Sequence, residues 1–329
     1  MERRTSYKNR YLNMSGKILI TGGAGFIGSN FTHYVAQLGT YDEICVLDNL
    51  TYAGNLGNIA KLIDSEKIKF VKGDIANKKF VFDVFKKEKF DYVVNFAAET
   101  HVDRSIIDSS IFVMTNVVGT QNLLEASKEF DIKRFHQIST DEVYGDLGFG
   151  SKNLFTEKTS LNPSSPYSAS KAGADMLVMA FWRTYKLPVT ISRCSNNYGQ
   201  FQFPEKLIPY LFHLASENKP LPLYGDGKNV RDWLYVEDHC EAVELILHKS
   251  KPGEVYNIGG HNEFKNIDIA KMILKFLKKP ENLITFVTDR LGHDERYAID
   301  ASKIEKTLGW KPKYTFECGI AKTFELMSK

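Results

Sequence analysis

Two groups of residues in this sequence could carry proton-transfer chemistry. Asp141 and Glu142 stand side by side directly after an apolar run at 134–140, and Tyr167 and Lys171 lie four residues apart in a helical stretch. Residues four apart share one face of a helix, so the two side chains can meet. An adjacent cation favours the ionised form of a phenol. We therefore expect Tyr167 to take a hydroxyl proton while a hydride leaves the same carbon.

A glycine-rich turn stands near the start of the chain. The apolar run KILITG leads into GGAGFIGS and then into a helical pattern, which gives the order strand, turn, helix. Gly22, Gly25 and Gly28 suit a tight turn, close approach of a pyrophosphate to the backbone, and close packing of helix on strand. Asp48 ends the next predicted strand, 20 residues after Gly28, where a carboxylate can bind ribose hydroxyls. The combination predicts a dinucleotide site, and the alternative is an ordinary glycine-rich turn.

The residues around Asp48 favour NAD over NADP. The flanking segment DNLTYAGN contains no lysine or arginine that could neutralise a 2′-phosphate, so the carboxylate should repel that group. Asp74 and Ile75 follow the third predicted strand, where we expect them to border the adenine, with a simple turn as the alternative.

Apolar strands alternate with amphipathic helical stretches over the first part of the chain. This order predicts an α/β fold, a Rossmann-type doubly wound parallel sheet. After about residue 195 the segments become shorter and richer in proline, which indicates a smaller α/β lobe that binds the substrate. The predicted strands lie at 43–48, 68–74, 92–99, 134–140 and 188–194. The predicted division is a disordered extension at 1–15, an NAD-binding domain at 16–195 to which later segments can return, and a lobe at 196–329, to which the family resemblance given below assigns nucleotide-sugar binding.

Composition narrows the class of function. The chain has 329 residues, a formal net charge of +3 and interspersed acids and bases, with no basic stripe of the kind that nucleic acid or an anionic membrane selects. Its four cysteines lie far apart with no CxxC pair, so we expect no metal site, no disulfide framework and a cytoplasmic location. No stretch is long and apolar enough to span a bilayer. These features predict small-molecule chemistry.

Several motifs resemble known enzymes. TGGAGFIGS, YSASK and a strand-end Ser-Thr pair resemble the extended short-chain dehydrogenase/reductase family over nearly the whole chain after Lys17. More narrowly, STDEVYGD, NFAAETHVDRSI, NNYGQFQFPEKLIP, PLPLYGDGKNVRDWLYVEDH and RLGHDERYAID are similar to the dTDP-glucose 4,6-dehydratase family. The resemblance implies NAD-dependent oxidation of a nucleotide sugar at C4, loss of water across C5 and C6, and hydride return to C6. The product is then a 4-keto-6-deoxy sugar of the dTDP-rhamnose route.

The resemblance also gives the candidate residues their roles. It implies that Tyr167 is the base at C4, Lys171 its activator, Glu142 the base at C5 and Asp141 the acid at the C6 oxygen, while Thr140 binds the C4 oxygen. Consecutive strand residues point to opposite faces, so both carboxylates reach one hexose only if the strand has ended by Thr140. We predict that it has. In the alternative, Asp141 and Glu142 have only a structural role, as acids that the helix dipole favours in the first turn of a helix.

Binding residues follow from the same resemblance. The predicted cofactor contacts are Gly22, Gly25, Phe26, Ile27, Gly28, Asp48, Asn49, Leu50, Thr51, Asp74, Ile75, Ala97, Ala98, Thr115, Tyr167, Lys171 and Asn197. The predicted substrate contacts are Thr100, Thr140, Asn196, Lys206, Leu207, Pro222, Tyr224, Arg231, Asn266, Arg290, His293 and Tyr297. Each lobe residue has a structural alternative, such as a surface ion pair between Arg231 and Asp232. One departure is Leu291, which stands where the family has proline and predicts a looser loop.

Two helical stretches carry more apolar residues than one buried face needs. They are 109–130 and the Tyr167 helix, and the resemblance implies a homodimer through such helices, with burial inside one chain as the alternative. Two other functions stay open. One is another nucleotide-sugar enzyme on this fold, such as a UDP-glucose 4-epimerase, which needs no acid-base pair at C5 and C6. The other is a non-catalytic NAD-binding regulatory or scaffold protein. The sequence does not decide between dTDP, UDP and GDP.

Overall fold

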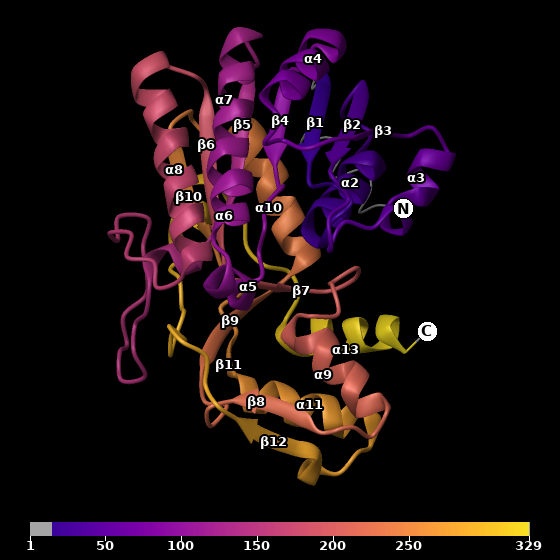
Figure 1. Ribbon diagram of the computed structural model, residues 1–329, viewed down its shortest axis with the longest axis vertical. Coiled ribbons are helices and arrows are strands. Elements are labelled where there is room, and N and C mark those ends of the chain that lie inside the picture. The colour runs from indigo at the N-terminus through magenta and orange to yellow at the C-terminus, as the bar shows by residue number, and fades with distance from the viewer. Residues whose placement is uncertain (1–14, 329) are drawn as a thin grey trace.

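A seven-stranded parallel sheet forms the larger part of the molecule (Figure 1). The computed structural model describes residues 15–328, so the predicted extension at 1–15 lies almost wholly outside the described residues. The strand order is β10-β6-β5-β4-β1-β2-β3, and every pairing within the sheet is parallel. The predicted Rossmann-type fold is confirmed. The strands are β1 Lys17–Thr21, β2 Glu43–Asp48, β3 Lys69–Lys72, β4 Tyr92–Asn95, β5 Arg134–Thr140, β6 Val189–Cys194 and β10 Glu254–Ile258.

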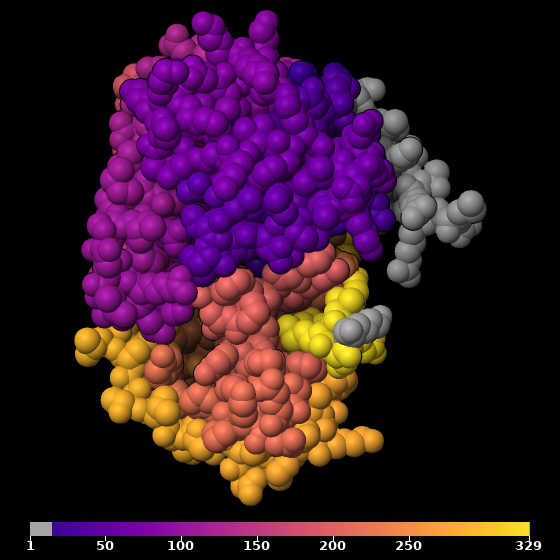
Figure 2. All heavy atoms as spheres, turned by 45° about the vertical axis from the view of Figure 1, so that its right-hand side comes forward, coloured from indigo at the N-terminus to yellow at the C-terminus, as the bar shows by residue number. Residues whose placement is uncertain are grey.

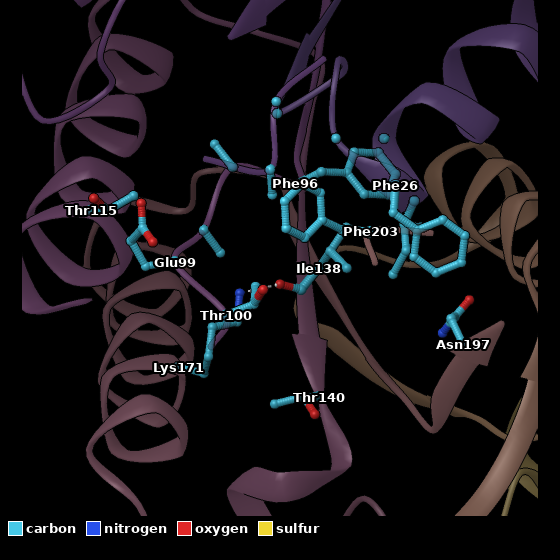
Figure 3. A pocket seen from close by; sticks show the side chains of 18 of the residues that line it. Phe26, Phe96, Glu99, Thr100, Thr115, Ile138, Thr140, Lys171, Asn197 and Phe203 are labelled. Atoms are coloured by element: carbon cyan, nitrogen blue, oxygen red, sulfur yellow. Dashed lines mark hydrogen bonds between the residues drawn. The ribbon is translucent and has the colours of Figure 1, made fainter. Parts of the chain in front are cut away.

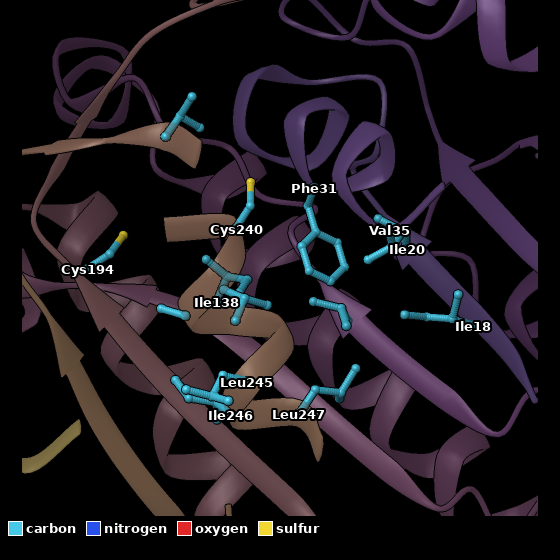
Figure 4. Packing of buried hydrophobic residues seen from close by; sticks show 14 of the residues in the cluster. Ile18, Ile20, Phe31, Val35, Ile138, Cys194, Cys240, Leu245, Ile246 and Leu247 are labelled. Carbon is cyan, nitrogen blue, oxygen red and sulfur yellow. The ribbon is translucent and has the colours of Figure 1, made fainter. Parts of the chain in front are cut away.

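Helices cover both faces of this sheet, because successive side chains of each strand point to opposite faces. In β1, Ile18 and Ile20 join the apolar cluster under α2 and α10, while Leu19 joins the cluster under α4, α7 and α8. Figure 4 shows Phe31 of α2 packed between Ile20 and the leucines of α10. The flanking helices are α2 Phe26–Leu38, α10 Val236–Lys249 and α12 Ser302–Leu308 on one face, and α4 Lys78–Glu88, α7 Thr120–Glu129 and α8 Pro166–Tyr185 on the other.

A smaller lobe lies beyond the carboxyl ends of the strands (Figures 1 and 2). It holds a three-stranded sheet in the order β11-β9-β7, a two-stranded sheet of β12 and β8, and a third apolar cluster. Its elements are β7 Asn196–Tyr198, α9 Leu207–Ser216, β8 Leu221–Tyr224, β9 Val230–Tyr235, β11 Glu263–Lys265, α11 Asn266–Leu277, η4 Glu281–Leu283, β12 Ile284–Val287 and α13 Phe316–Met327. Strand β10 and helices α10 and α12 come from the same part of the sequence as the lobe, but they belong to the seven-stranded sheet and the helices that cover it, which we call the larger layer.

Short elements connect the strands at the edge that faces the lobe. One helical run passes from α6 through a π-helical segment, η2, into α7, and π segments inside helices frequently mark functional sites. No helix of residues 15–328 is long and apolar enough to cross a membrane. The connecting elements are η1 Leu56–Asn58, α3 Ala60–Asp64, α5 Val102–Ile107, α6 Ser110–Phe112, η2 Val113–Gly119 and η3 Asp141–Tyr144.

Candidate active site

A cavity of about 340 Å³ opens at the carboxyl ends of the parallel strands. It is lined by the glycine turn, the ends of β2, β4 and β5, η3, α8 and the segment that enters the lobe. Ligands of doubly wound sheets bind at this edge. The predicted residues that line it are Gly22, Gly25, Phe26, Ile27, Gly28, Asp48, Asn49, Thr51, Asp74, Ile75, Ala97, Ala98, Thr100, Thr115, Thr140, Asp141, Glu142, Tyr167, Lys171, Asn196, Asn197, Lys206 and Leu207.

The glycine turn has the shape of a phosphate cradle. Gly22 has a φ of +67°, and a Cβ on it would lie 2.6 Å from the amide nitrogen of Ala97. A Cβ on Gly28 would overlap the carbonyl oxygen of Gly22, so helix and turn can approach this closely only without side chains. Helix α2 starts after Gly25 without a side-chain cap, which leaves its first backbone N–H groups available to an anion. The residues fit a dinucleotide pyrophosphate.

Asp48 is held in place at the end of β2. Its Oδ2 accepts from the backbone N–H of Ala24 at 3.0 Å and its Oδ1 from that of Leu50 at 2.8 Å. Burial raises the pKa of this carboxyl, while the two N–H groups oppose the rise. Leu50 itself is not among the lining residues, and its φ of 55° turns the chain away after the strand. Its backbone therefore orients Asp48, whereas Asn49 and Thr51 line the cavity.

Tyr167 and Lys171 face the cavity from α8, and both are buried. The Nζ of Lys171 donates to the carbonyl oxygen of Ile138 at 2.7 Å (Figure 3). Burial, followed by the charge of Glu142, raises the pKa of Tyr167 well above its usual value. Burial and the nearby carboxylate thus favour the protonated phenol, while the Nζ of Lys171 donates to the main chain. The predicted ionisation of Tyr167 depends also on the cationic nicotinamide ring and stays a prediction.

Asp141 and Glu142 begin the single turn η3 directly after β5, which ends at Thr140. The predicted end of the strand is confirmed. The Oγ1 of Thr140 accepts from the backbone N–H of Glu142 at 3.3 Å, as an N-cap does, and also lies 3.3 Å from the Oδ1 of Asp141. Because the chain leaves the strand here, both carboxylates line one cavity. The Oδ2 of Asp141 is buried and has no hydrogen-bond partner within residues 15–328.

The two carboxyl groups have different electrostatic surroundings. Burial and the neighbouring charges of Glu142 and Asp232 raise the pKa of Asp141 well above its usual value. Burial also raises the pKa of Glu142, but the charges of Arg290, Arg231 and Lys206 oppose it. Three cationic side chains therefore oppose the rise of the Glu142 pKa, whereas two carboxylates add to the rise of the Asp141 pKa and Arg231 opposes it. Such a division is what an acid and a base on neighbouring carbons require.

The lobe contributes two sets of predicted residues. Lys206 enters the cavity beside α9, and its Nζ donates to the carbonyl oxygen of Thr100 at 3.0 Å. The side chain of Asn197 is fixed by the buried His239, whose Nδ1 lies 2.9 Å from the Asn197 Oδ1. A second set stands outside the residues that line the cavity. It comprises Pro222, Tyr224, Arg231, Asn266, Arg290, His293 and Tyr297.

Three members of this second set meet the larger layer or one another across the cleft. Arg290 lies 3.7 Å from the carboxylate of Asp103, to which the Tyr224 hydroxyl also donates at 3.2 Å. The rings of Tyr224 and His293 meet edge to face at 6.0 Å. The unusual Leu291 is 77% exposed, so its side chain makes little packing contact.

Arg231 is buried and lies 4.2 Å above the ring of Tyr297. Its Nη2 donates to the carbonyl oxygen of Asp294 at 2.9 Å. Asp232 instead accepts from the backbone N–H groups of Gly260 and Asn262. The surface ion pair between Arg231 and Asp232 that sequence left open is therefore not what the structure shows.

The sequence analysis did not identify several lining residues. One of them is Glu99, whose main chain is held by the side chain of Asn116. The Asn116 side chain accepts from the Glu99 N–H at 2.9 Å and donates to the Glu99 carbonyl oxygen at 3.0 Å, and it also donates to the hydroxyl of Ser170 at 2.8 Å. Asn116 lies in the π segment, which regular helical periodicity does not predict. Lining residues without a prior prediction include Tyr52, Phe96, Glu99, Ile138, Ser139, Cys194, Ser195, Gln202, Phe203, Glu205 and Trp233. Residues 15–328 hold no cluster of His, Cys, Asp and Glu suited to a metal ion.

The chain is similar to known proteins over most of its length. The family model described as GDP-mannose 4,6 dehydratase matches residues 19–323. A dTDP-glucose 4,6-dehydratase of Neisseria meningitidis serogroup B is 50% identical over 329 residues, covering 94% of this chain and 92% of the relative. The crystal structure of dTDP-glucose 4,6-dehydratase from Bacillus anthracis in complex with NAD is 50% identical, covers 95% of this chain and 96% of its own, and has a TM-score of 0.88. A dTDP-glucose 4,6-dehydratase structure from Streptomyces venezuelae with NAD bound is 44% identical, covers 95% and 97%, and has a TM-score of 0.91.

Proposed function

This chain belongs to the GDP-mannose 4,6 dehydratase family, and from that premise we propose that it is an NAD-dependent dTDP-glucose 4,6-dehydratase. Bound NAD accepts a hydride from C4 of the sugar and returns it at C6, so no cofactor is consumed. The observation that carries the proposal is the pair Asp141 and Glu142, which share one cavity with Tyr167 but differ in electrostatic surroundings.

The protein residues then divide the proton transfers among themselves. Tyr167 takes the C4 hydroxyl proton, and the Thr140 hydroxyl holds the oxygen from which it comes. The resulting C4 ketone makes the C5 proton acidic, and ionised Glu142 removes it; the surrounding cations oppose the rise that burial causes in the pKa of this carboxyl. Asp141, kept protonated by burial, gives its proton to the departing C6 oxygen, which leaves as water.

Lys171 has a role in positioning as well as charge. Its bond to the carbonyl oxygen of Ile138 ties α8 to β5, which leads into Thr140. Because the protein environment alone raises the pKa of Tyr167, the phenol needs a further positive charge in the cavity to become a base near neutral pH. The cationic ring of oxidised nicotinamide is of the required sign.

We assign the lobe to the nucleotide part of the substrate. Arg231 and Arg290 can offer planar guanidinium groups to a diphosphate, which arginine binds through paired charge-assisted hydrogen bonds. Arg290 is only 3.7 Å from Asp103, an ion pair that a diphosphate could replace. Leu291, exposed in the same loop, leaves that loop without the rigidity of proline.

Two further properties belong to the proposal. Large apolar side chains are exposed along α5, α6, η2 and α8, among them Ile107, Ile111, Met114 and Met176, and we assign these helices to a homodimer interface.

The cysteines Cys45, Cys194, Cys240 and Cys318 are free thiols. This supports a reducing compartment, the cytoplasm.

The alternatives are distinguished by chemistry. A UDP-glucose 4-epimerase uses a tyrosine base and NAD at C4 but has no need for a protonated acid beside an ionised one at C5 and C6. A scaffold protein has no need for either pair. The buried, hydrogen-bond-free Oδ2 of Asp141 costs stability, which is expected of a group kept for function.

One incubation separates these functions. The purified protein is given dTDP-glucose in deuterated water without added NAD, and the product is analysed by mass spectrometry and NMR. A dehydratase that retains its cofactor loses one water and incorporates a deuteron at C5. Formation of a galactose epimer without loss of water supports the epimerase, and unchanged substrate in the presence of saturating NAD supports the scaffold. Parallel incubations with UDP-glucose and GDP-mannose test the nucleotide, and faster turnover of either would contradict the proposed substrate.

A further inference from the structure

Arg193 is a buried arginine beside the point where the two halves of the proposed active site meet. It lies on β6, is 4% exposed and pairs in register with Ser139, while the next residue, Cys194, pairs with Thr140. The Arg193 side chain therefore leaves the sheet beside Ser139, the last residue but one of β5. Burying an arginine is costly unless its donors are paired, so its partners indicate what it does.

Its partners come from two different elements. The Nε donates to the Oδ2 of Asp175 on α8 at 2.9 Å, and the Nη1 donates to the hydroxyl of Tyr144 at the end of η3 at 3.0 Å. The guanidinium carbon also lies 5.0 Å from the centre of the Tyr144 ring. Asp175 is fully buried and stands four residues after Lys171, on the same face of α8. One cation thus joins the helix of Tyr167 and Lys171 to the turn of Asp141 and Glu142.

The Tyr144 hydroxyl is fixed from both sides. It accepts from Arg193 and donates to the Oδ1 of Asn257 at 2.7 Å, and Asn257 in turn donates to the carbonyl oxygen of Phe155 at 2.9 Å. The rings of Tyr144 and Phe155 stack at 5.1 Å. These contacts leave Tyr144 one position, and with it the end of η3.

The turn η3 depends on such support more than α8 does. It has four residues, too few to be stable alone, and its start is held by the 3.3 Å bond to Thr140. Helix α8 has 20 residues, a proline in its first turn and a capping box at Ser165. Loss of the bond between Arg193 and Tyr144 should therefore displace the turn with its two carboxylates and leave Tyr167 and Lys171 in place.

We propose that Arg193 is a positioning residue: through Tyr144 and Asp175 it fixes the turn that carries Asp141 and Glu142 relative to the helix that carries Tyr167 and Lys171. This inference rests on the proposed function, in which elimination needs both halves of the site in register, whereas C4 oxidation needs Tyr167 and Lys171 of α8 and Thr140 of β5 but neither carboxylate of η3. A displacement of about 1 Å can cost on the order of 10²-fold in rate. The elimination step should carry that loss, and the oxidation step should not.

The variant Tyr144→Phe tests this while leaving the pair between Arg193 and Asp175 intact. Tyr41→Phe is the matched control, because it removes a buried hydroxyl that donates to Glu244 at 2.9 Å, in a segment that precedes β2 and does not line the cavity. After rapid mixing with dTDP-glucose, Tyr144→Phe should form reduced cofactor at the rate of the parent protein, and its decay should be on the order of 10²-fold slower. Tyr41→Phe should change neither rate.

Amide hydrogen exchange gives a readout that needs no catalysis. Peptides covering 141–144 should exchange faster in Tyr144→Phe and not in Tyr41→Phe, at matched global stability. Arg193→Lys is measured beside it, because Tyr144→Phe also removes the bond to Asn257, whereas lysine at 193 keeps the charge beside Asp175 and lacks only the fork that reaches Tyr144. Arg193→Lys should show the same faster exchange and the same slow elimination, and it carries the test alone if Tyr144→Phe does not fold. Equal slowing of both steps, or an unchanged turn in the exchange data, overturns the inference. A parent protein that does not dehydrate the sugar overturns the proposed function instead, and the exchange data still decide whether Arg193 holds the turn.

Discussion

The residues Asp141 and Glu142 differ only by one methylene, and the structure separates them by environment. Asp141 is 1% exposed and faces other carboxylates, whereas Glu142 is surrounded by cations of the lobe. Adjacent acids in one low-dielectric cavity cannot both ionise easily. This difference supports the proposed assignment of Asp141 as the acid and Glu142 as the base, and that assignment predicts a pH dependence with a definite sign.

The elimination step should show a bell-shaped pH profile. It should rise as pH rises through the raised pKa of Glu142, which must lose its proton, and fall as pH rises through the pKa of Asp141, which lies well above its usual value and whose proton must stay. In Asp141→Asn the rate should drop by roughly 10²- to 10⁴-fold and the alkaline limb should disappear. Rapid-mixing measurements of the decay of reduced cofactor across pH check this. An alkaline limb that persists in the variant would assign the acid to another group.

Among the elements, the strands and the glycine turn were predictable from sequence, and other segments were not. Continuous apolar runs bounded by turns identified β2, β4, β5 and β6, because strands buried on both faces have that pattern. The five residues of β10 carry no signal of which sheet they join, and only their pairing with β6 decides it. The π segment with Asn116 departs from helical periodicity and was equally unpredictable.

The residues of the site also divide into those that the sequence predicts and those that it does not. The glycine turn and the YxxxK spacing are local, so the sequence located them, whereas the raised pKa of Tyr167 depends on burial and then on the charge of Glu142, which approaches from η3. Glu205 lines the cavity from a link without regular periodicity. Long-range proximity of this kind is set by tertiary packing rather than by spacing along the chain.

Substitutions of glycine by alanine test whether the glycine turn needs its close backbone packing. In Gly28→Ala the new Cβ overlaps the carbonyl oxygen of Gly22, so we expect a loss of about 1–3 kcal/mol in the free energy of unfolding and weaker NAD binding. Gly150→Ala is the control, because no atom lies within 4 Å of its added Cβ, and it should stay within about 0.5 kcal/mol of the parent. Thermal unfolding and titration with NAD measure both effects. Tight NAD binding by Gly28→Ala would show that the turn is not the cofactor cradle.

At the scale of the whole molecule, the cleft lies between the part built on the parallel sheet and the smaller lobe, which Figure 2 shows one above the other. The two parts meet through side chains such as Arg290 and Asp103. In the proposed function the sheet supplies the reacting groups, and the lobe supplies the cations Arg290, Arg231 and Lys206, which oppose the rise of the Glu142 pKa. The proposal therefore connects nucleotide binding with the charge state of Glu142, because a diphosphate bound by Arg231 and Arg290 changes the field in which Glu142 titrates.

The proposed dimer can be tested through its exposed apolar side chains. Ile107 is 87% exposed, and Ile107→Glu together with Ile111→Glu should give a monomer in sedimentation measurements, because charge is excluded from an apolar interface. Phe286→Glu is the control, since Phe286 is 57% exposed on β12 in the lobe. It should leave the mass of the parent unchanged. A monomeric parent protein, or a dimer that survives both glutamates, would rule out this interface.

The most direct test of the central claim is a single-turnover experiment with Glu142→Gln. Glutamine keeps the shape of the side chain but cannot accept the C5 proton, while Tyr167 and Lys171 remain to support oxidation at C4. With dTDP-glucose in deuterated water, this variant should form reduced cofactor that persists, with no deuterium at C5 and no loss of water. Normal dehydration by the variant, or failure to form reduced cofactor at all, would contradict the division of roles between α8 and η3.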